Sequence, residues 1–176
     1  MTSRNGHSMR PFGRSLPMQL MRAREAVMAR FRPHLAGHGL TEQQWRVIRA
    51  LQETGEIDSA ALADACCLHA ASLSRILPHL ESAGLVARRT SRSDQRRVIV
   101  SLTARGRRLF AEVAPESEAV YAALTREIGA SRLEEVYRVL DALIATLAAP
   151  GPVRRAGVRR RPDAVETARK DRRPVP

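Results

Sequence analysis

The sequence predicts a mainly α-helical protein that carries one small β-hairpin, and three observations lead to this fold class. Apolar residues recur at intervals of three and four along most of the chain, which is the period of an amphipathic helix. Residues 85–102 instead alternate apolar and polar positions around the turn-forming segment SRSDQ, as two short strands do. The length of 176 residues is sufficient for one domain with a sizeable core.

The first helix is expected within residues 16–40. It follows a basic arm, residues 1–15, which we expect to be disordered because it has few apolar residues. Ser15 is placed to cap the helix. Pro33 should kink or end it, and Pro78 should bend the fourth helix, because proline removes a backbone donor and its ring clashes with the preceding turn.

Residues 41–102 are predicted to contain three more helices and then the hairpin. Thr41 and Gln44 have the spacing of a capping box at the start of the second helix. Residues 56–58 should form a short extended link. Ser59 is expected to cap a short third helix, and the fourth follows after a tight turn.

Residues 103–149 are predicted to form a long helix, which Thr103 is expected to cap, and a last helix. Pro115 should bend or split the long one. Ser131 is expected to cap the last helix, whose apolar stripe is too wide for one small domain to bury and therefore suits an interface. Residues 150–176 are rich in Pro, Gly and Arg and are predicted to be a disordered basic tail.

Two short helices joined by a tight turn and followed by a two-stranded hairpin make a winged helix-turn-helix. The hairpin, called the wing below, is strongly basic. It holds one acid, Asp94, and five arginines, namely Arg88, Arg89, Arg92, Arg96 and Arg97. Charge at the tip of a hairpin stabilises no core, and the net charge of +12 favours a polyanionic partner, nucleic acid first and an anionic membrane second. As part of a winged helix-turn-helix, the wing is expected to face double-stranded DNA.

The segment from Leu77 to Gly106, LPHLESAGLVARRTSRSDQRRVIVSLTARG, closely resembles the pattern LxxLExxGLVxRxxxxxDxRxxxVxLTxxG of the MarR family of transcription regulators. The resemblance covers roughly residues 16–148. AREAVMARFRP, LTEQQWRVIRAL and DQRRVIVSLT are also similar to regulators of homoprotocatechuate (hydroxyphenylacetate) degradation operons. The resemblance implies a homodimer paired through the first and the last two helices, and a ligand-responsive repressor of an aromatic-catabolism operon.

The resemblance also implies which residues contact DNA. His69, Ser72, Ser74 and Arg75 lie in the first turns of the recognition helix, where Ser hydroxyls suit phosphates and Arg75 can fork onto guanine. At the wing tip, Asp94 would brace the turn, while Arg96 would reach the minor groove together with Arg92. A simple surface ion pair, worth about 0–1 kcal/mol, is the alternative for Asp94 and Arg96. The remaining three arginines would meet phosphates or solvent.

Members of the family bind small aromatic acids or their thioesters between the dimer helices and the DNA-binding lobe. Arg24 is the candidate for the ligand's carboxylate, and Met28, Phe31 and Trp45 could sandwich its ring. Three of the four candidates have a plainer alternative: Trp45 and Met28 as core packing, and Arg24 as the ion-pair partner of Glu25 or of a carboxylate on a partner chain.

Two other regulatory mechanisms remain open. Cys66 and Cys67 precede the recognition helix among apolar residues, where buried packing is the main expectation and oxidation sensing the alternative. The second alternative is an architectural protein that coats DNA without sensing a ligand.

We expect no enzyme, cofactor or metal. The sole enzyme hypothesis is a dyad of Cys67 and His69, and side chains two apart on a helix point away from each other. His34 and His38 have no further ligand at metal spacing. No run approaches the roughly 18 apolar residues of a membrane helix, and no secretory signal is evident, so we expect a cytoplasmic protein.

Overall fold

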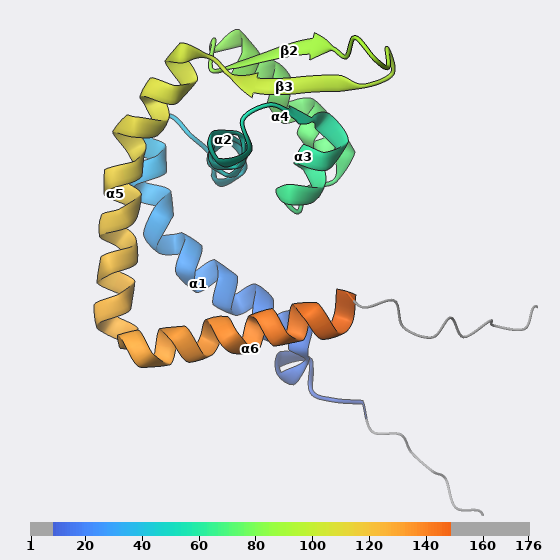
Figure 1. Cartoon of the computed structure of the whole chain (residues 1–176). Helices are drawn as coiled ribbons and strands as arrows, with labels where there is room; N and C mark the ends of the chain where they lie inside the picture. Colours follow the sequence, from blue (N-terminus) through green and yellow to red (C-terminus); the bar gives the residue numbers. More distant parts are fainter. Residues whose placement is uncertain (1–8, 149–176) are drawn as a thin grey trace, which may run out of the picture. The chain divides into compact units, whose positions relative to one another are not determined.

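The computed structural model describes residues 9–148 as helices and one small sheet (Figure 1). The chain divides into two compact units, one ending at Ala130 and one beginning at Ser131. In chain order the elements are η1 (Phe12–Arg14), α1 (Leu16–Gly37), α2 (Glu42–Thr54), β1 (Ile57–Asp58), α3 (Ser59–Ala65), α4 (Ala70–Ser82), β2 (Val86–Thr90), β3 (Val98–Leu102), α5 (Ala104–Ile128) and α6 (Ala130–Ala148). The mainly α fold with a winged helix-turn-helix is confirmed.

The core of the first unit lies where α2, α3, α4 and the sheet meet the end of α1 and the first half of α5. Its most deeply buried large side chains come from all of these elements: Leu35, Val47, Ile48, Leu51, Leu62, Leu80, Val100 and Val113. Burial of one such Leu or Ile contributes roughly 1.5–3 kcal/mol, so this cluster fixes how the helix-turn-helix is held by the longer helices.

The sheet has three antiparallel strands in the order β1-β3-β2. The wing is formed by β2 and β3, paired from Val86 opposite Leu102 to Thr90 opposite Val98, and it extends past α4 (Figure 1). The predicted extended link is a third strand, because Ile57 and Asp58 pair with Val100 and Ile99 of β3. The base of the wing is therefore joined by main-chain bonds to the residues that precede α3.

Two of the expected helix caps are confirmed and three differ. The Thr41 capping box is complete, and the Thr103 hydroxyl accepts the Gly106 N–H. Ser59 is not the cap of α3, because the Asp58 carboxylate beside it accepts the Ala60 and Ala61 N–H groups. Ser131 lies inside α6, which begins one residue earlier. Ser15 occupies the cap position of α1, but its hydroxyl donates to the Phe12 carbonyl instead.

The prolines interrupt neither α1 nor α5. α1 continues through Pro33 to Gly37, and α5 runs through Pro115 as one helix; α4 likewise contains Pro78. All three prolines are exposed, so solvent can reach the carbonyl groups that lose their donors. Core residues on both sides of Pro33 and Pro78, such as Leu35 and Leu80, hold the helices in place.

The ends of the chain are described only in part. Phe12–Arg14 form a 3-10 turn, so this part of the predicted disordered arm is ordered. Residues 1–8 and the predicted tail, residues 150–176, lie outside the described residues.

The second unit contributes one described element, the amphipathic helix α6. None of its described residues is buried. Its exposed large apolar side chains are Val136, Tyr137, Val139, Ile144 and Leu147. No single helix in the described part of the chain is long and apolar enough to cross a membrane; α3 and α4 meet that test only as a pair bent by 107°.

Candidate nucleic-acid interface and effector region

The recognition helix α4 presents a polar side to solvent. Leu73, Ile76, Leu77 and Leu80 are buried and hold the helix against the core. Of the four predicted DNA-contacting residues, Ser74 and Arg75 are exposed and Ser72 is half-buried. His69 is exposed and precedes the helix as its N-cap residue, without a side-chain cap. The four residues thus lie in or just before the first two turns of α4.

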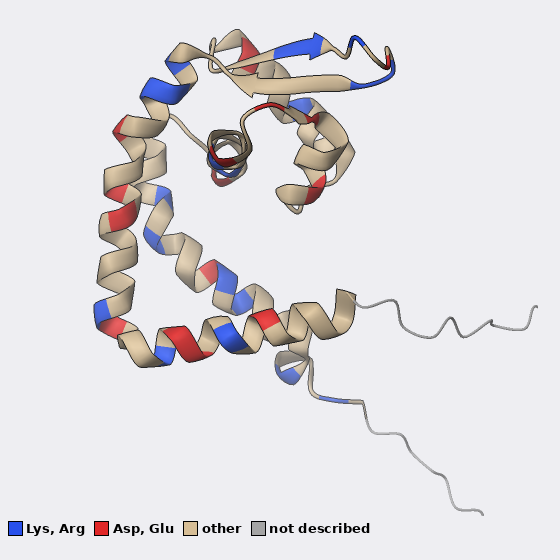
Figure 2. Cartoon of the chain, in the orientation of Figure 1, with Lys and Arg blue, Asp and Glu red and all other residues tan. Residues whose placement is uncertain are grey.

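The turn of the wing is closed by Asp94. Its carboxylate accepts the Arg96 N–H at 3.0 Å, and its carbonyl accepts the Arg97 N–H at 3.0 Å. The Ser91 N–H donates to the Arg97 carbonyl at 2.9 Å, which completes the loop. Asp94 therefore braces the turn through the backbone, and the blue positions of Figure 2 mark the arginines around it.

Three of the five wing arginines are held by acids of the same chain. Arg88 binds Glu81 of α4 through its Nε at 2.8 Å, Arg89 binds Glu56 at 2.6 Å and Arg97 binds Asp58 at 3.0 Å. The hydrogen bond from Arg88 lowers the pKa of Glu81 below its ordinary value. In the DNA-free chain these three arginines therefore pair with acids, and their contact with phosphates stays a prediction.

Arg92 and Arg96 differ from the other three. Both are exposed at the wing turn, and within residues 9–148 neither has an acidic partner. An unpaired guanidinium can bind a phosphate or a groove edge without first breaking an internal ion pair. Among the described residues, the two free arginines are thus the two that the resemblance placed at the minor groove, and the other three are tethered to acids.

Arg24 belongs to a charged cluster that joins α1 to the start of α2. It pairs with Glu25 at 2.8 Å and with Glu42 at 2.5 Å. Arg32 binds the same two acids. Burial acts to raise the pKa of Glu42, but the hydrogen bonds from Arg32 and Arg24 outweigh it and the pKa is lowered. A ligand carboxylate would have to compete with both acids for Arg24.

The predicted aromatic residues pack against α5. Trp45 stacks on Phe110 with ring centres 5.5 Å apart, and Phe31 meets the edge of Tyr121 at 4.8 Å. Phe31 and Trp45 are 4% and 5% exposed, while Met28 is half-buried against the same core. Among the described residues Phe31 and Trp45 do not face each other; each ring has a separate partner on α5.

Arg49 and Tyr121 also lie in this region, and neither was predicted from the sequence. Arg49 donates to the Tyr121 hydroxyl at 3.1 Å, and its guanidinium lies 5.9 Å from the centre of that ring. No carboxylate within residues 9–148 pairs with Arg49. One signal was available, because Arg49 follows Trp45 by one helical turn and so lies on the same side of α2. Tyr121 offered none, since only the fold brings α5 to α2.

His34 and His38 lie at the contact between α1 and α5. His34 Nε2 is 3.0 Å from the hydroxyl of Ser117, which is 3% exposed, and His38 Nε2 is 3.0 Å from Glu116. Burial lowers the pKa of His34, and its Nδ1 has no hydrogen-bond partner among the described residues. Within residues 9–148 no three His, Cys, Asp or Glu side chains gather as a metal site.

The two cysteines have different environments. Cys66 is fully buried, and burial raises the pKa of its thiol, which lowers its reactivity. Cys67 is exposed in the turn before α4 and adopts a φ of 47°. The expectation of buried packing therefore holds for Cys66 and was wrong for Cys67.

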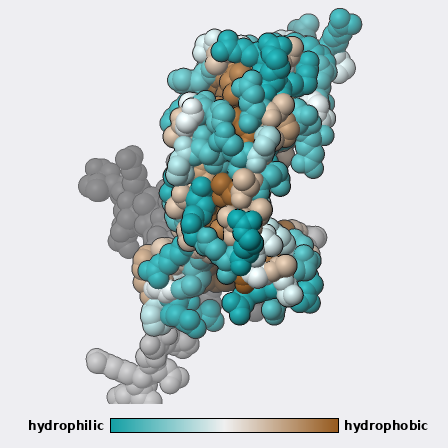
Figure 3. Space-filling model, turned by 90° about the vertical axis from the view of Figure 1, so that its left-hand side faces the viewer, coloured by the Kyte–Doolittle hydropathy of each residue, from teal (hydrophilic) through white to brown (hydrophobic). Residues whose placement is uncertain are grey.

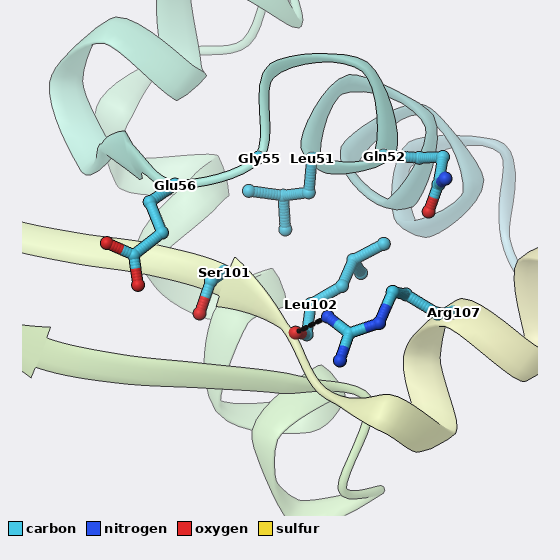
Figure 4. Close-up of a pocket in the computed structure, with 7 residues that line it drawn as sticks. All are labelled: Leu51, Gln52, Gly55, Glu56, Ser101, Leu102 and Arg107. Atoms are coloured by element: carbon cyan, nitrogen blue, oxygen red, sulfur yellow. Dashed lines mark hydrogen bonds between the residues drawn. The ribbon is translucent and has the colours of Figure 1, made fainter.

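An open pocket of about 310 Å³ lies between the end of α2, β3 and the start of α5 (Figure 4). Leu51 and Leu102 form its apolar part. Glu56 is already paired with Arg89, and Arg107 donates to the Leu102 carbonyl at 2.8 Å. None of the predicted effector residues lines this pocket.

The outer side of α5 is mostly hydrophilic. Figure 3 shows only small, separate hydrophobic areas along it. Its apolar residues Val113, Phe110 and Leu109 instead pack toward the core. This side of the helix therefore offers no broad apolar surface.

A recognition helix beside a basic wing defines a winged helix-turn-helix DNA-binding protein. Residues 40–98 match the MarR family model. The chain is 40% identical to the HTH-type transcriptional regulator FarR of Neisseria gonorrhoeae, an alignment that covers 73% of this chain and 93% of that protein. It is 37% identical to the homoprotocatechuate degradative operon repressor of Escherichia coli, over 74% of this chain and 88% of that protein. The chain belongs to the MarR family and is a transcriptional regulator.

Among solved structures, the chain is similar to NadR in complex with 4-hydroxyphenylacetate. The TM-score is 0.71 at 37% identity, and the match covers 78% of this chain and 100% of that one. These similarities also support the narrower resemblance to regulators of homoprotocatechuate degradation.

Proposed function

We propose that this regulator is a repressor that binds a pseudo-palindromic operator as a homodimer and is released by a small aromatic acid or its CoA thioester. The observation that carries the DNA-binding part is the pair of arginines without an acidic partner among the described residues, Arg92 and Arg96, at the wing turn that Asp94 braces. A two-fold dimer presents two recognition helices, each with its wing, and these can enter successive major grooves of the operator. An aromatic-catabolism operon is proposed as the target because the repressor of one is 37% identical to this chain.

The effector would bind in the first unit, between α1, α2 and α5. Met28, Phe31 and Trp45 supply apolar and aromatic surface there. Arg24 was the sequence candidate for the ligand's carboxylate, but Glu25 and Glu42 already bind it. Arg49 is the better candidate, because its only polar partner among the described side chains is the neutral Tyr121 hydroxyl.

The ligand would act by stabilising one arrangement of the dimer over another. A ligand that binds both arrangements equally shifts nothing, so the effector must prefer the arrangement whose recognition helices no longer fit the operator. Moving the population from mostly bound to mostly free requires about 5 kcal/mol of differential binding.

The test is fluorescence anisotropy on the DNA upstream of the gene and on a scrambled duplex, at fixed salt. Each titration is repeated with 4-hydroxyphenylacetate, homoprotocatechuate, hydroxycinnamates and their CoA thioesters. Specific binding that one compound releases supports the proposal. Arg49→Gln should then lower the affinity for that compound by about tenfold or more without changing the affinity for the operator. Arg24→Gln should lower the affinity for the compound less.

Other outcomes separate the alternatives. Specific binding that no compound changes would favour redox sensing, because the exposed Cys67 adjoins the recognition helix. A double Cys66→Ser and Cys67→Ser variant should then lose its response to peroxide. Equal binding to both duplexes, with a steep salt dependence, would leave only the architectural alternative.

A further inference from the structure

The Asp58 carboxylate has two different tasks. One oxygen, Oδ1, accepts the Ala60 and Ala61 N–H groups at 2.9 and 3.4 Å and so caps α3. The other, Oδ2, accepts the Nε–H of Arg97 at 3.0 Å. The Asp58 side chain is 12% exposed, whereas that of Arg97 is 54% exposed. The acid is thus fixed within the fold, and the arginine reaches to it from the wing.

Arg97 is the residue at which the wing turn closes. Its N–H donates to the Asp94 carbonyl, and its own carbonyl accepts the Ser91 N–H. The next residue, Val98, begins β3. A constraint on the Arg97 side chain therefore limits the position of the whole turn, which contains Arg92 and Arg96.

The other two tethers are weaker constraints. The Glu81 and Glu56 side chains are 38% and 56% exposed, and exposed ion pairs contribute little because water screens them. Their arginines, Arg88 and Arg89, lie on β2, away from the turn. Only Asp58 combines low exposure, two backbone hydrogen bonds and a partner at the turn.

We propose that Asp58 is a positioning residue for DNA binding: through Arg97 it holds the wing turn, with Arg92 and Arg96, at a fixed place relative to the helix-turn-helix. Arg97 serves as a tether and not as a phosphate contact. This inference rests on the proposed DNA interface and deepens it.

Simple electrostatics makes the opposite prediction for Asp58. A carboxylate near the DNA-binding surface repels phosphate, so removing its charge should tighten binding to every duplex. Positioning predicts weaker binding to the operator, with no loss on scrambled DNA. The two accounts therefore differ in the sign of the effect.

The experiment uses the full chain with Asp58→Asn, Arg97→Gln and the double variant. Asn is itself a good helix N-cap, so Asp58→Asn keeps the cap of α3 and removes the ionic partner of Arg97. We expect each single variant to weaken operator binding about fivefold and leave scrambled-duplex binding and the salt slope unchanged. The double variant should be no weaker than either single one, because both remove the same tether.

Two controls calibrate the measurement. Arg96→Gln should reduce the steepness with which log affinity falls against log salt concentration by about one, as the loss of one charge contact with DNA does. Glu56→Gln removes the acid from a comparable but exposed pair and should leave operator binding unchanged. Tighter binding of Asp58→Asn to both duplexes, or a drop of about one in the salt slope of Arg97→Gln, would overturn the proposal.

Hydrogen exchange on the DNA-free protein tests the tether independently of DNA binding. Asp58→Asn and Arg97→Gln should speed exchange of the Ser91 and Arg97 amides, while buried amides of α4 keep their protection. Unchanged exchange at both amides would refute the tether. If the wild-type protein shows no specific DNA binding, the proposed function is refuted. The hydrogen-exchange result then decides by itself whether Asp58 and Arg97 tether the wing turn.

Discussion

Among the glycines that the structure describes, Gly106 has the least room for an added methyl group. An ideal Cβ at this position would lie 2.1 Å from the Leu85 carbonyl oxygen and 3.1 Å from Leu102 Cδ2. The same Leu85 oxygen accepts the Thr103 N–H at 3.0 Å, so it is part of the junction between the wing and α5. The backbone at Gly106 can therefore approach the wing only without a side chain.

Gly106→Ala should destabilise the protein by about 2 kcal/mol or more, because one of two packed backbone segments must move. The measurement is the midpoint of urea unfolding. Gly37→Ala is the matched control, since Gly37 is also helical and nothing lies within 4 Å of its ideal Cβ. That variant should be neutral or more stable by up to about 1 kcal/mol. Equal midpoints for the two variants would contradict the packing argument.

At the scale of elements, the contact between α1 and α5 contains a half-buried histidine whose pKa is lowered. Burial lowers the pKa of His34 in the folded chain below the ordinary value of 6.5. The groups around it are Ser117 and Glu116 on α5 and His38 on α1. Because the unfolded chain binds a proton more readily at His34, stability should be full above pH 6.5 and fall as the pH drops toward the folded pKa.

This pH dependence can be isolated with His34→Gln, which keeps a polar side chain near Ser117 and does not titrate. We expect the wild-type free energy of unfolding to fall more steeply below pH 6.5 than that of the variant, by at most about 1.4 kcal/mol per pH unit. The difference between the two curves cancels the other histidines and the carboxylates. Parallel curves between pH 7 and 5 would show that His34 does not contribute.

At the scale of the whole molecule, α6 has a surface that its own unit does not cover. Leu133, Leu140 and Leu143 are half-buried, and Val136, Tyr137, Ile144 and Leu147 are exposed along the same stripe. An apolar stripe of this kind is expected at an interface, and two-fold dimers are the commonest arrangement. We therefore propose that α6 takes part in the dimer.

Ile144→Glu should shift the protein from dimer to monomer and weaken operator binding strongly, since one protomer contacts only one half-site. Sedimentation equilibrium measures the mass, and anisotropy measures the binding. Ala142→Glu places the same charge on the opposite side of α6, where Ala142 is exposed, and should change neither. An Ile144→Glu variant that stays dimeric would exclude this stripe as the interface.

The sequence by itself determined the class of fold and the family. Helical and alternating periodicities are local, and each follows from which side chains one element buries, so the helices and the two wing strands were predictable. The Thr41 capping box also involves only residues three apart. The same holds for the brace of Asp94, whose carboxylate accepts an N–H two residues on.

Only the tertiary structure decided what depends on residues far apart in the chain. It paired β1 with β3, and it kept α1 helical through Pro33 because Leu35 is buried beyond it. It also supplied the acids Glu81, Glu56 and Asp58 that hold three of the wing arginines, and it left Arg92 and Arg96 without an acidic partner among the described residues. The charge of a side chain and its place in the periodic pattern limit which contacts it can make. The residue that it contacts depends on the packing that brings distant elements together.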